Sequence, residues 1–175
     1  MSTIFVILIA AILVWIAIIY NRLVMAKNTV MAAWSDIDVQ LKRRHDLIPK
    51  LVEAVRQYAS YESATISAVT ALRTESQQSQ DLGKKQEVEA ELGKKIQRLL
   101  AVAEDYPDLK ANQSFLDLQY NLTEVEKNIQ YARRYYNGAV RNLNVRIESF
   151  PDLMIARFFH FTEAQYFDFD ESLQT

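Results

Sequence analysis

The sequence has no cysteine and very few residues that interrupt helices. The absence of cysteine excludes disulfide bonds, thiolate nucleophiles and thiolate metal sites, while leaving the cellular compartment open. Glycine and proline number three each among 175 residues, and 50% of the residues are hydrophobic. So few breakers in a chain of one domain or slightly more predict long helices rather than a sheet with many turns.

The chain also lacks a strong charge of one sign and a recognisable catalytic motif. Its net charge is −2, so no overall positive field recruits nucleic acid, and we expect no nucleic-acid partner. The two histidines, His45 and His160, stand in neither Glu-x-x-His nor His-x-x-x-His spacing. No glycine-rich phosphate loop and no nucleophile–base pair is visible. We therefore expect no metal, no cofactor and no enzymatic activity.

One long hydrophobic run lies near the N-terminus. Residues 4–20, IFVILIAAILVWIAIIY, carry no charge and would cover roughly 25 Å as a helix, close to a hydrocarbon core. We expect a transmembrane helix that contacts the lipid bilayer through these residues. A cleaved signal peptide is the alternative, but no basic residue precedes the run and Arg22 crowds the small-residue site Val24-Met25-Ala26.

The charges that flank this run predict its orientation. No basic residue precedes it, whereas Arg22 and Lys27 follow closely and Lys42, Arg43 and Arg44 come later. Basic residues favour the cytoplasmic side of a membrane. We expect the N-terminus outside and the bulk of the chain in the cytoplasm.

An apolar stripe with alternating steps of three and four residues predicts a long helix after the membrane run. Its members are Val30, Trp34, Ile37, Leu41, Ile48, Val52, Val55, Ala59, Ile66 and Val69. Pro49 lies inside it, where proline removes one backbone donor and collides with the carbonyl of His45. Because the stripe keeps its phase, we favour a kinked continuous helix over two helices, ending at a polar turn within residues 74–87.

Two further helices follow. A shorter one carries Val88, Leu92, Ile96, Leu99 and Val102 or Ala103 on one face. Tyr106-Pro107 interrupts it, and Asp108 or Asn112 would cap the next helix. That last helix carries Phe115, Leu118, Leu122, Val125, Ile129, Ala132, Tyr136, Ala139 and Leu143, and Pro151 closes it.

This spacing predicts antiparallel packing in a helical bundle. The expected fold is all-α, with an N-terminal transmembrane helix leading into an antiparallel bundle of long helices. The expected divisions are an anchor at 1–24, a bundle at 25–149 and an aromatic-rich, acidic segment at 150–175.

Several polar residues fall on or beside the apolar stripes. They are Arg44, Glu62, Arg73, Glu126, Arg133, Asn137 and Asn144. A charge buried between helices costs several kcal/mol unless it is paired. The spacing thus predicts pairs that fix the register, for example Arg44 or Arg133 with Glu62 or Glu126, while Lys42 and Arg43 point to solvent. Two alternatives stay open, namely exposure at the margin of a helix and a ligand or catalytic site.

Aromatic residues gather near the C-terminus. They are Phe158, Phe159, Phe161, Tyr166, Phe167 and Phe169. One interpretation is a plug that covers an end of the bundle. The other is a contact surface for a neighbouring subunit or a partner, since exposed aromatic clusters mark contacts.

Six ordered stretches together match one known family. They are YNRLV at 20–24, AWSDIDVQLKRRHDLIPKLVEAV at 33–55, YASYE at 58–62, YPDLKANQSFLDLQ at 106–119, EKNIQYARRYYNGAV at 126–140 and FPDLMIARFFHF at 150–161. The sequence resembles the LemA family of bacterial membrane proteins. It departs at Leu143, where the family commonly has tyrosine, and at His160, where glycine is common.

The resemblance implies a single N-terminal transmembrane helix, an antiparallel helical bundle and no settled enzymatic activity. It also implies a role in membrane organisation, including organelle-like membrane shaping, or a place beside membrane proteases. Our first hypothesis is a non-enzymatic scaffold that self-associates on the bacterial inner membrane. The second is an adaptor for another membrane protein, such as a membrane-embedded protease.

Overall fold

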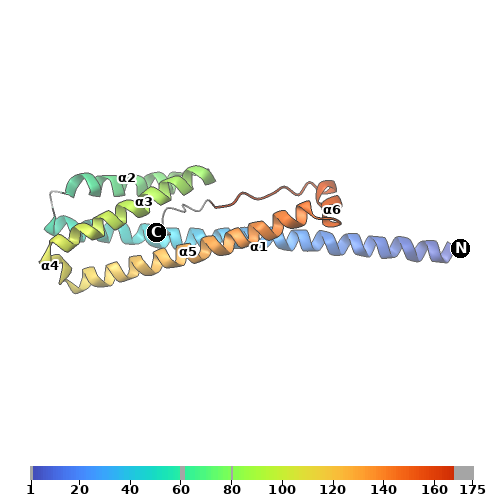
Figure 1. Ribbon diagram of the computed structural model, residues 1–175, viewed down its shortest axis with the longest axis horizontal. Coiled ribbons are helices and arrows are strands. Elements are labelled where there is room, and N and C mark those ends of the chain that lie inside the picture. Colours follow the sequence, from blue (N-terminus) through green and yellow to red (C-terminus); the bar gives the residue numbers. More distant parts are fainter. Residues whose placement is uncertain (1, 60–61, 80, 168–175) are drawn as a thin grey trace. The chain divides into compact units, whose positions relative to one another are not determined.

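The computed structural model describes residues 2–59, 62–79 and 81–167 (Figure 1). Its elements are α1 (Ser2–Tyr58), α2 (Ser63–Gln78), α3 (Leu82–Val102), the 3₁₀ turn η2 (Ala103–Asp105), α4 (Pro107–Lys110), α5 (Gln113–Glu148) and α6 (Asp152–Phe158). The described ranges contain helices and no strand, which confirms the all-α prediction.

The chain forms two compact units. Unit 1 comprises Met1–Ile37 and Ala132–Tyr166, and unit 2 comprises Asp38–Tyr131 and Phe167–Thr175. Helices α1 and α5 contribute to both. Within unit 1 the start of α1 runs antiparallel to the end of α5, which leads into α6. Within unit 2 the remainder of these two helices packs with α2, α3 and α4.

The core of unit 2 is built from the predicted apolar faces. The predicted Val55 and Val69 are fully buried together with Leu92 and Leu99 of α3. On α1, Leu51, which the predicted stripe did not include, is fully buried, and the predicted Val52 is half-buried. On α5 the whole predicted stripe is buried except Ala132, which is half-buried. The three- and four-residue spacing therefore identified the inward faces of α3 and α5 correctly.

Helix α1 passes through Pro49 without a break, which confirms its predicted continuity at that residue. The predicted extension of the same helix to Val69 is wrong. Helix α1 ends at Tyr58, and α2 begins at Ser63 and runs back along it. The apolar spacing hid this reversal because both helices keep the same phase, and no glycine or proline marks the turn.

The turn between α2 and α3 contains fewer residues than the polar stretch 74–87, which we predicted as the turn. Helix α2 continues to Gln78, and α3 begins at Leu82. Asp81 caps α3, its carboxylate accepting a hydrogen bond from the Lys84 amide at 2.8 Å. Of the two predicted caps for α5, Asn112 takes the role, because its side-chain oxygen accepts from the Ser114 amide at 2.9 Å.

The start of α1 is the one helix in the described ranges that is long and apolar enough to cross a membrane. Its most apolar 18-residue window has a mean hydropathy of 3.0, and only 6% of that window is buried. A core helix of a soluble domain would be mostly covered. Side chains from Ile4 to Ile18 are largely exposed, and burial begins at Ile19. This segment is a candidate membrane span.

Candidate functional site

A buried ion cluster in unit 2 is centred on Glu89 of α3. Arg44 of α1 and Glu89 form an ion pair, and both residues are almost completely buried. Arg44 also donates from Nη2 to the Glu89 carbonyl at 3.1 Å and from Nη1 to Glu126 Oε2 of α5 at 2.8 Å. One guanidinium thus connects three helices, α1, α3 and α5.

The second carboxylate oxygen of Glu89 has two further partners. His45 of α1 lies with Nε2 at 2.7 Å from Oε1, and the hydroxyl of Ser76 on α2 donates to the same oxygen. Both groups are buried. The Glu89 carboxylate therefore links α3 to α1 and α2. The cluster as a whole contains side chains from α1, α2, α3 and α5.

The surroundings of Glu89 keep it ionised. Burial alone would raise the pKa of its carboxyl, but the His45 hydrogen bond, the Arg44 charge and the Ser76 hydrogen bond outweigh that cost. Together they lower the pKa from 4.5 to about 2. An ionised carboxylate accepts hydrogen bonds and donates none, so His45 Nε2 carries the shared proton.

This arrangement is not that of a nucleophile and its base. Ser76 and His45 both bond to Glu89, whereas a catalytic serine would hydrogen-bond directly to the histidine. With its low pKa, Glu89 holds no proton to transfer near neutral pH. The arrangement is suited to fixing how the four helices align.

The sequence folds this way because both charged residues lie on apolar stripes. Glu89 precedes Leu92, Ile96 and Leu99 in steps of three and four, as Arg44 falls between Leu41 and Ile48. Gly93 lies beside the guanidinium, where an added Cβ would be 3.4 Å from Arg44 Nη1. A Cβ at this position would thus be in ordinary van der Waals contact with the guanidinium.

A contact between α2 and α1 replaces the backbone hydrogen bond that α1 loses at Pro49. Proline has no amide hydrogen, so the His45 carbonyl, four residues earlier, loses its normal helical donor. Arg73 of α2 donates from Nε to this carbonyl at 2.9 Å. A side chain from the neighbouring helix thus satisfies the freed backbone group, and α1 stays continuous.

The polar residues predicted from the sequence lie in different environments in the structure. Arg44 and Glu126 meet in the cluster, and Arg73 reaches its edge. Lys42 and Arg43 are exposed. Glu62 instead lies at the start of α2, where it accepts from the Thr65 hydroxyl at 3.3 Å. A register-setting role for these residues stays a prediction.

The remaining members belong to unit 1. Arg133 and Asn137 are half-buried on α5. Asn144 is buried and holds the extended segment after α6, because its amide nitrogen donates to the Ala164 carbonyl and its oxygen accepts from the Ala164 amide, both at 2.9 Å. Tyr136 adds a third bond, from its hydroxyl to the Gln165 carbonyl at 2.9 Å. Burial raises the pKa of Tyr136.

Glu89, His45 and Ser76 were not among the predicted site residues. A signal for Glu89 was available, since a charge on the α3 stripe meets the criterion that identified Arg44. Ser76 lies within a polar stretch, so its position in the sequence does not distinguish it from its neighbours. His45 has no second histidine or carboxylate at a metal-binding spacing, so no pattern marks it as a site residue. In the part of the chain that the structure describes, no group of three or more His, Asp or Glu side chains could hold a metal ion.

The C-terminal aromatic residues divide between exposed and buried positions. Phe158 is 74% exposed, Phe159 and Tyr166 are also exposed, Phe161 is half-buried and Phe167 is buried. Phe169 lies outside the described residues. The rings of Phe159 and Phe161 lie 4.7 and 5.9 Å from that of Tyr20. Neither predicted role, plug or contact surface, is tested by these positions.

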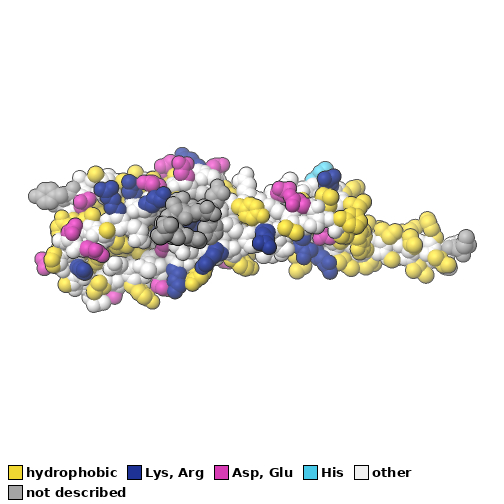
Figure 2. Space-filling model, in the orientation of Figure 1, with side chains coloured by type: hydrophobic (Ala, Val, Ile, Leu, Met, Phe, Trp, Pro, Cys, Tyr) yellow, Lys and Arg dark blue, Asp and Glu magenta, His cyan; other side chains and the backbone are white. Residues whose placement is uncertain are grey.

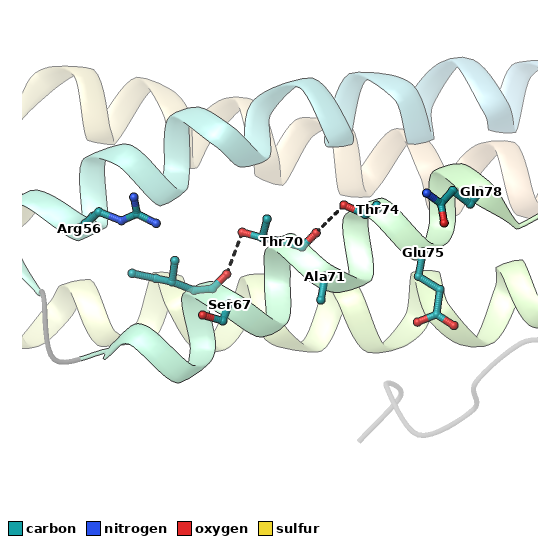
Figure 3. A pocket seen from close by; sticks show the side chains of 8 residues that line it. Arg56, Ser67, Thr70, Ala71, Thr74, Glu75 and Gln78 are labelled. Atoms are coloured by element: carbon teal, nitrogen blue, oxygen red, sulfur yellow. Dashed lines mark hydrogen bonds between the residues drawn. The ribbon is translucent and has the colours of Figure 1, made fainter.

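An open groove of about 600 Å³ runs along α2 in unit 2 (Figure 3). Its lining residues are Arg56, Ile66, Ser67, Thr70, Ala71, Thr74, Glu75 and Gln78. The hydroxyls of Thr70 and Thr74 donate to carbonyls of the preceding helical turn, at 2.9 and 3.0 Å. These donors are already used within α2, and the groove shows no convergent set of polar groups.

Comparison with known proteins finds relatives that are named magnetosome protein MamQ and Protein LemA. The chain is 25% identical over 174 residues to the magnetosome proteins MamQ 1 and MamQ 2 of Paramagnetospirillum magneticum, covering 85% of this chain and 64% of each relative. It is 27% identical over 161 residues to Protein LemA of Metamycoplasma hominis, covering 87% and 74%. The chain thus spans less than two thirds of the MamQ proteins, and none of these names specifies an enzyme.

The family assignment rests on a longer match. The model of the LemA family matches residues 33–175, which include the bundle helices, the Arg44–Glu89 cluster and the aromatic C-terminal segment. The resemblance carried by the six sequence stretches is confirmed, and this chain belongs to the LemA family.

Proposed function

We propose that this chain is a non-enzymatic, single-pass scaffold that self-associates and helps to organise a bacterial membrane. Residues 4–20 anchor it in the inner membrane. The N-terminus lies outside and the bundle lies in the cytoplasm, an orientation supported by Arg22 and Lys27 directly after the apolar run.

The observation that carries this proposal is the outer face of α5. In unit 1, Tyr135 and Val145 of α5 are both exposed, and helical geometry places them within an arc of roughly 80°, opposite the buried stripe. Gly138 falls in the same arc, and an added Cβ there would meet nothing within 4 Å. No packing inside the chain explains a glycine at the middle of this helix, where it costs about 1 kcal/mol relative to alanine.

A second copy of the chain is the occupant that membrane anchoring favours. Anchored copies share one orientation and are confined to a surface, which raises their effective concentration for lateral contact. Tyrosine offers large amphipathic contact area, and glycine lets another helix approach closely. The names of the MamQ relatives as magnetosome proteins support a role in membrane organisation.

An adaptor for another membrane protein is the second candidate. The observation in its favour is the exposure of Phe158 and Tyr166 in the C-terminal aromatic segment. This alternative predicts that a second protein co-purifies with the chain at a fixed ratio, and that the chain without it is monomeric.

The cysteine-free sequence permits a direct test of self-association. Tyr135→Cys lies on the outer face of α5, and Glu87→Cys, exposed on α3, is the control. In native membranes a short bismaleimide should link copies through residue 135 and leave the control mostly unlinked. Equal, weak cross-linking at both positions would refute the α5 contact.

A further inference from the structure

We propose that α6 lies in the membrane–water interface beside the anchor, with the side chains of Phe150, Met154 and Phe158 in contact with lipid. This proposal rests on the membrane anchor of the proposed function and is independent of self-association. It gives the exposed part of the C-terminal aromatic segment a lipid surface as its partner.

The first argument is the unusual exposure of apolar side chains around a helix of seven residues. Phe150, Met154 and Phe158 are 78%, 61% and 74% exposed. Met154 and Phe158 are four residues apart, so they lie one above the other on one face of α6. Ile155 and Ala156 are buried on the other side. The exposed apolar face therefore points away from the rest of unit 1.

The second argument is the level at which α6 meets the anchor. The Phe159 and Phe161 rings contact Tyr20, with centroids 4.7 and 5.9 Å away. By helical rise Tyr20 is about 24 Å from Ile4, while a hydrocarbon core is about 30 Å thick. Tyr20 thus lies near the edge of the core, where aromatic side chains are enriched. The contact sets the end of α6 at the same level.

Local hydrogen bonds fix the turn of the chain at the end of α6. The Phe161 amide donates to the Ala156 carbonyl at 2.9 Å, and the His160 amide donates to the Arg157 carbonyl at 3.3 Å. With His160 at a φ of 57°, these bonds form the Schellman ending of a helix. This ending turns the chain so that Phe161 faces Tyr20 and residues 161–166 continue to the Asn144 contact.

The surrounding surface matches a membrane interface in both polarity and charge. Figure 2 shows hydrophobic side chains covering the start of α1 and continuing over the end of α6 beside it. Arg22 and Arg157 are exposed near Tyr20 and Phe159 in the sequence, and such cations reach lipid phosphates. The acidic Asp152 is engaged by Arg146 at 3.4 Å. Lipid completes this surface without a second protein.

Site-directed fluorescence on the full chain tests the proposal. Met154→Cys and Phe158→Cys are each labelled with NBD and placed, at high dilution, in vesicles of phosphatidylcholine and phosphatidylglycerol. Tyr120→Cys is an equally exposed control on α5, and Ile12→Cys reports on the anchor. One quencher is aqueous iodide, and the other is a lipid with a spin label near its headgroup.

We expect the spin-labelled lipid to quench positions 154 and 158, with a loss of the iodide quenching seen at position 120. Iodide quenching at 154 and 158 equal to that at 120 would overturn the proposal. Protection from both quenchers would also overturn it, because another protein would then cover α6. Failure of the anchor is distinguishable, since aqueous iodide would then quench position 12, which an inserted anchor protects.

Discussion

At the scale of single residues, Glu89 shows how a buried charge is held in a helical core. Its two carboxylate oxygens are shared among Arg44, His45 and Ser76. Removing one partner of a buried ion pair leaves the other charge uncompensated, which costs about 3–5 kcal/mol. We expect Glu89→Gln to lower the free energy of unfolding by this amount, measured by chemical denaturation. Glu91→Gln, on the exposed side of the same helix and paired with Lys95, should cost below about 1 kcal/mol.

The pH dependence of stability provides a separate test of Glu89. Its pKa is lower in the folded chain, about 2, than its ordinary value of 4.5. The folded state therefore gains stability from this group fully above pH 4.5, and loses it as the pH falls towards about 2. The loss should be about 3 kcal/mol. Glu89→Gln should lack this component, so parallel acid titrations of both proteins would contradict the account.

His160 occupies a left-handed backbone conformation, with a φ of 57°. Such a conformation costs a side-chain-bearing residue about 1–2 kcal/mol, and glycine avoids most of it. We expect His160→Gly to raise the free energy of unfolding by about 1 kcal/mol, because its greater freedom when unfolded offsets part of the gain. His160→Ala is the control, since it removes the ring and keeps the strain. A stabilisation by alanine equal to that by glycine would disprove the backbone explanation.

At the scale of elements, α1 depends on α2 where Pro49 interrupts its hydrogen bonds. Arg73→Met keeps most of the packing but leaves the His45 carbonyl without a donor, and we expect a cost of about 1–3 kcal/mol. In a Pro49→Ala background the alanine amide can satisfy that carbonyl. The cost of Arg73→Met should then fall by about half or more. Additive effects of the two substitutions on unfolding would show that the contact does not serve this purpose.

The sequence predicts helices well here because burial follows a simple spacing. The stripes on α3 and α5 and the cap at Asn112 are visible in the pattern. The reversal between Tyr58 and Ser63 is not, because α1 and α2 keep one phase across it. Arg44 stood out as a charge on a stripe, whereas its partners Glu89 and Ser76 depend on how α2 and α3 return to α1. Such pairing is a property of the tertiary fold.

At the scale of the whole molecule, the two proposals assign two surfaces of the described residues to contacts outside the chain. The outer face of α5 is assigned to a second copy, and the exposed face of α6 to lipid. The contact through α5 requires a defined number of copies of the chain, whereas the contact through α6 requires only a bilayer. A substitution such as Tyr135→Glu on α5 should therefore weaken assembly and leave membrane association intact, which cross-linking and membrane flotation would measure separately.

Self-association is the central claim, and the mass of the intact particle tests it most directly. The full chain is extracted from the membrane into lipid nanodiscs, and size-exclusion chromatography with light scattering gives the protein mass at micromolar concentration. The account predicts a mass of two or more 20.3 kDa chains, reduced by Tyr135→Glu. A uniform particle holding a single chain would contradict it.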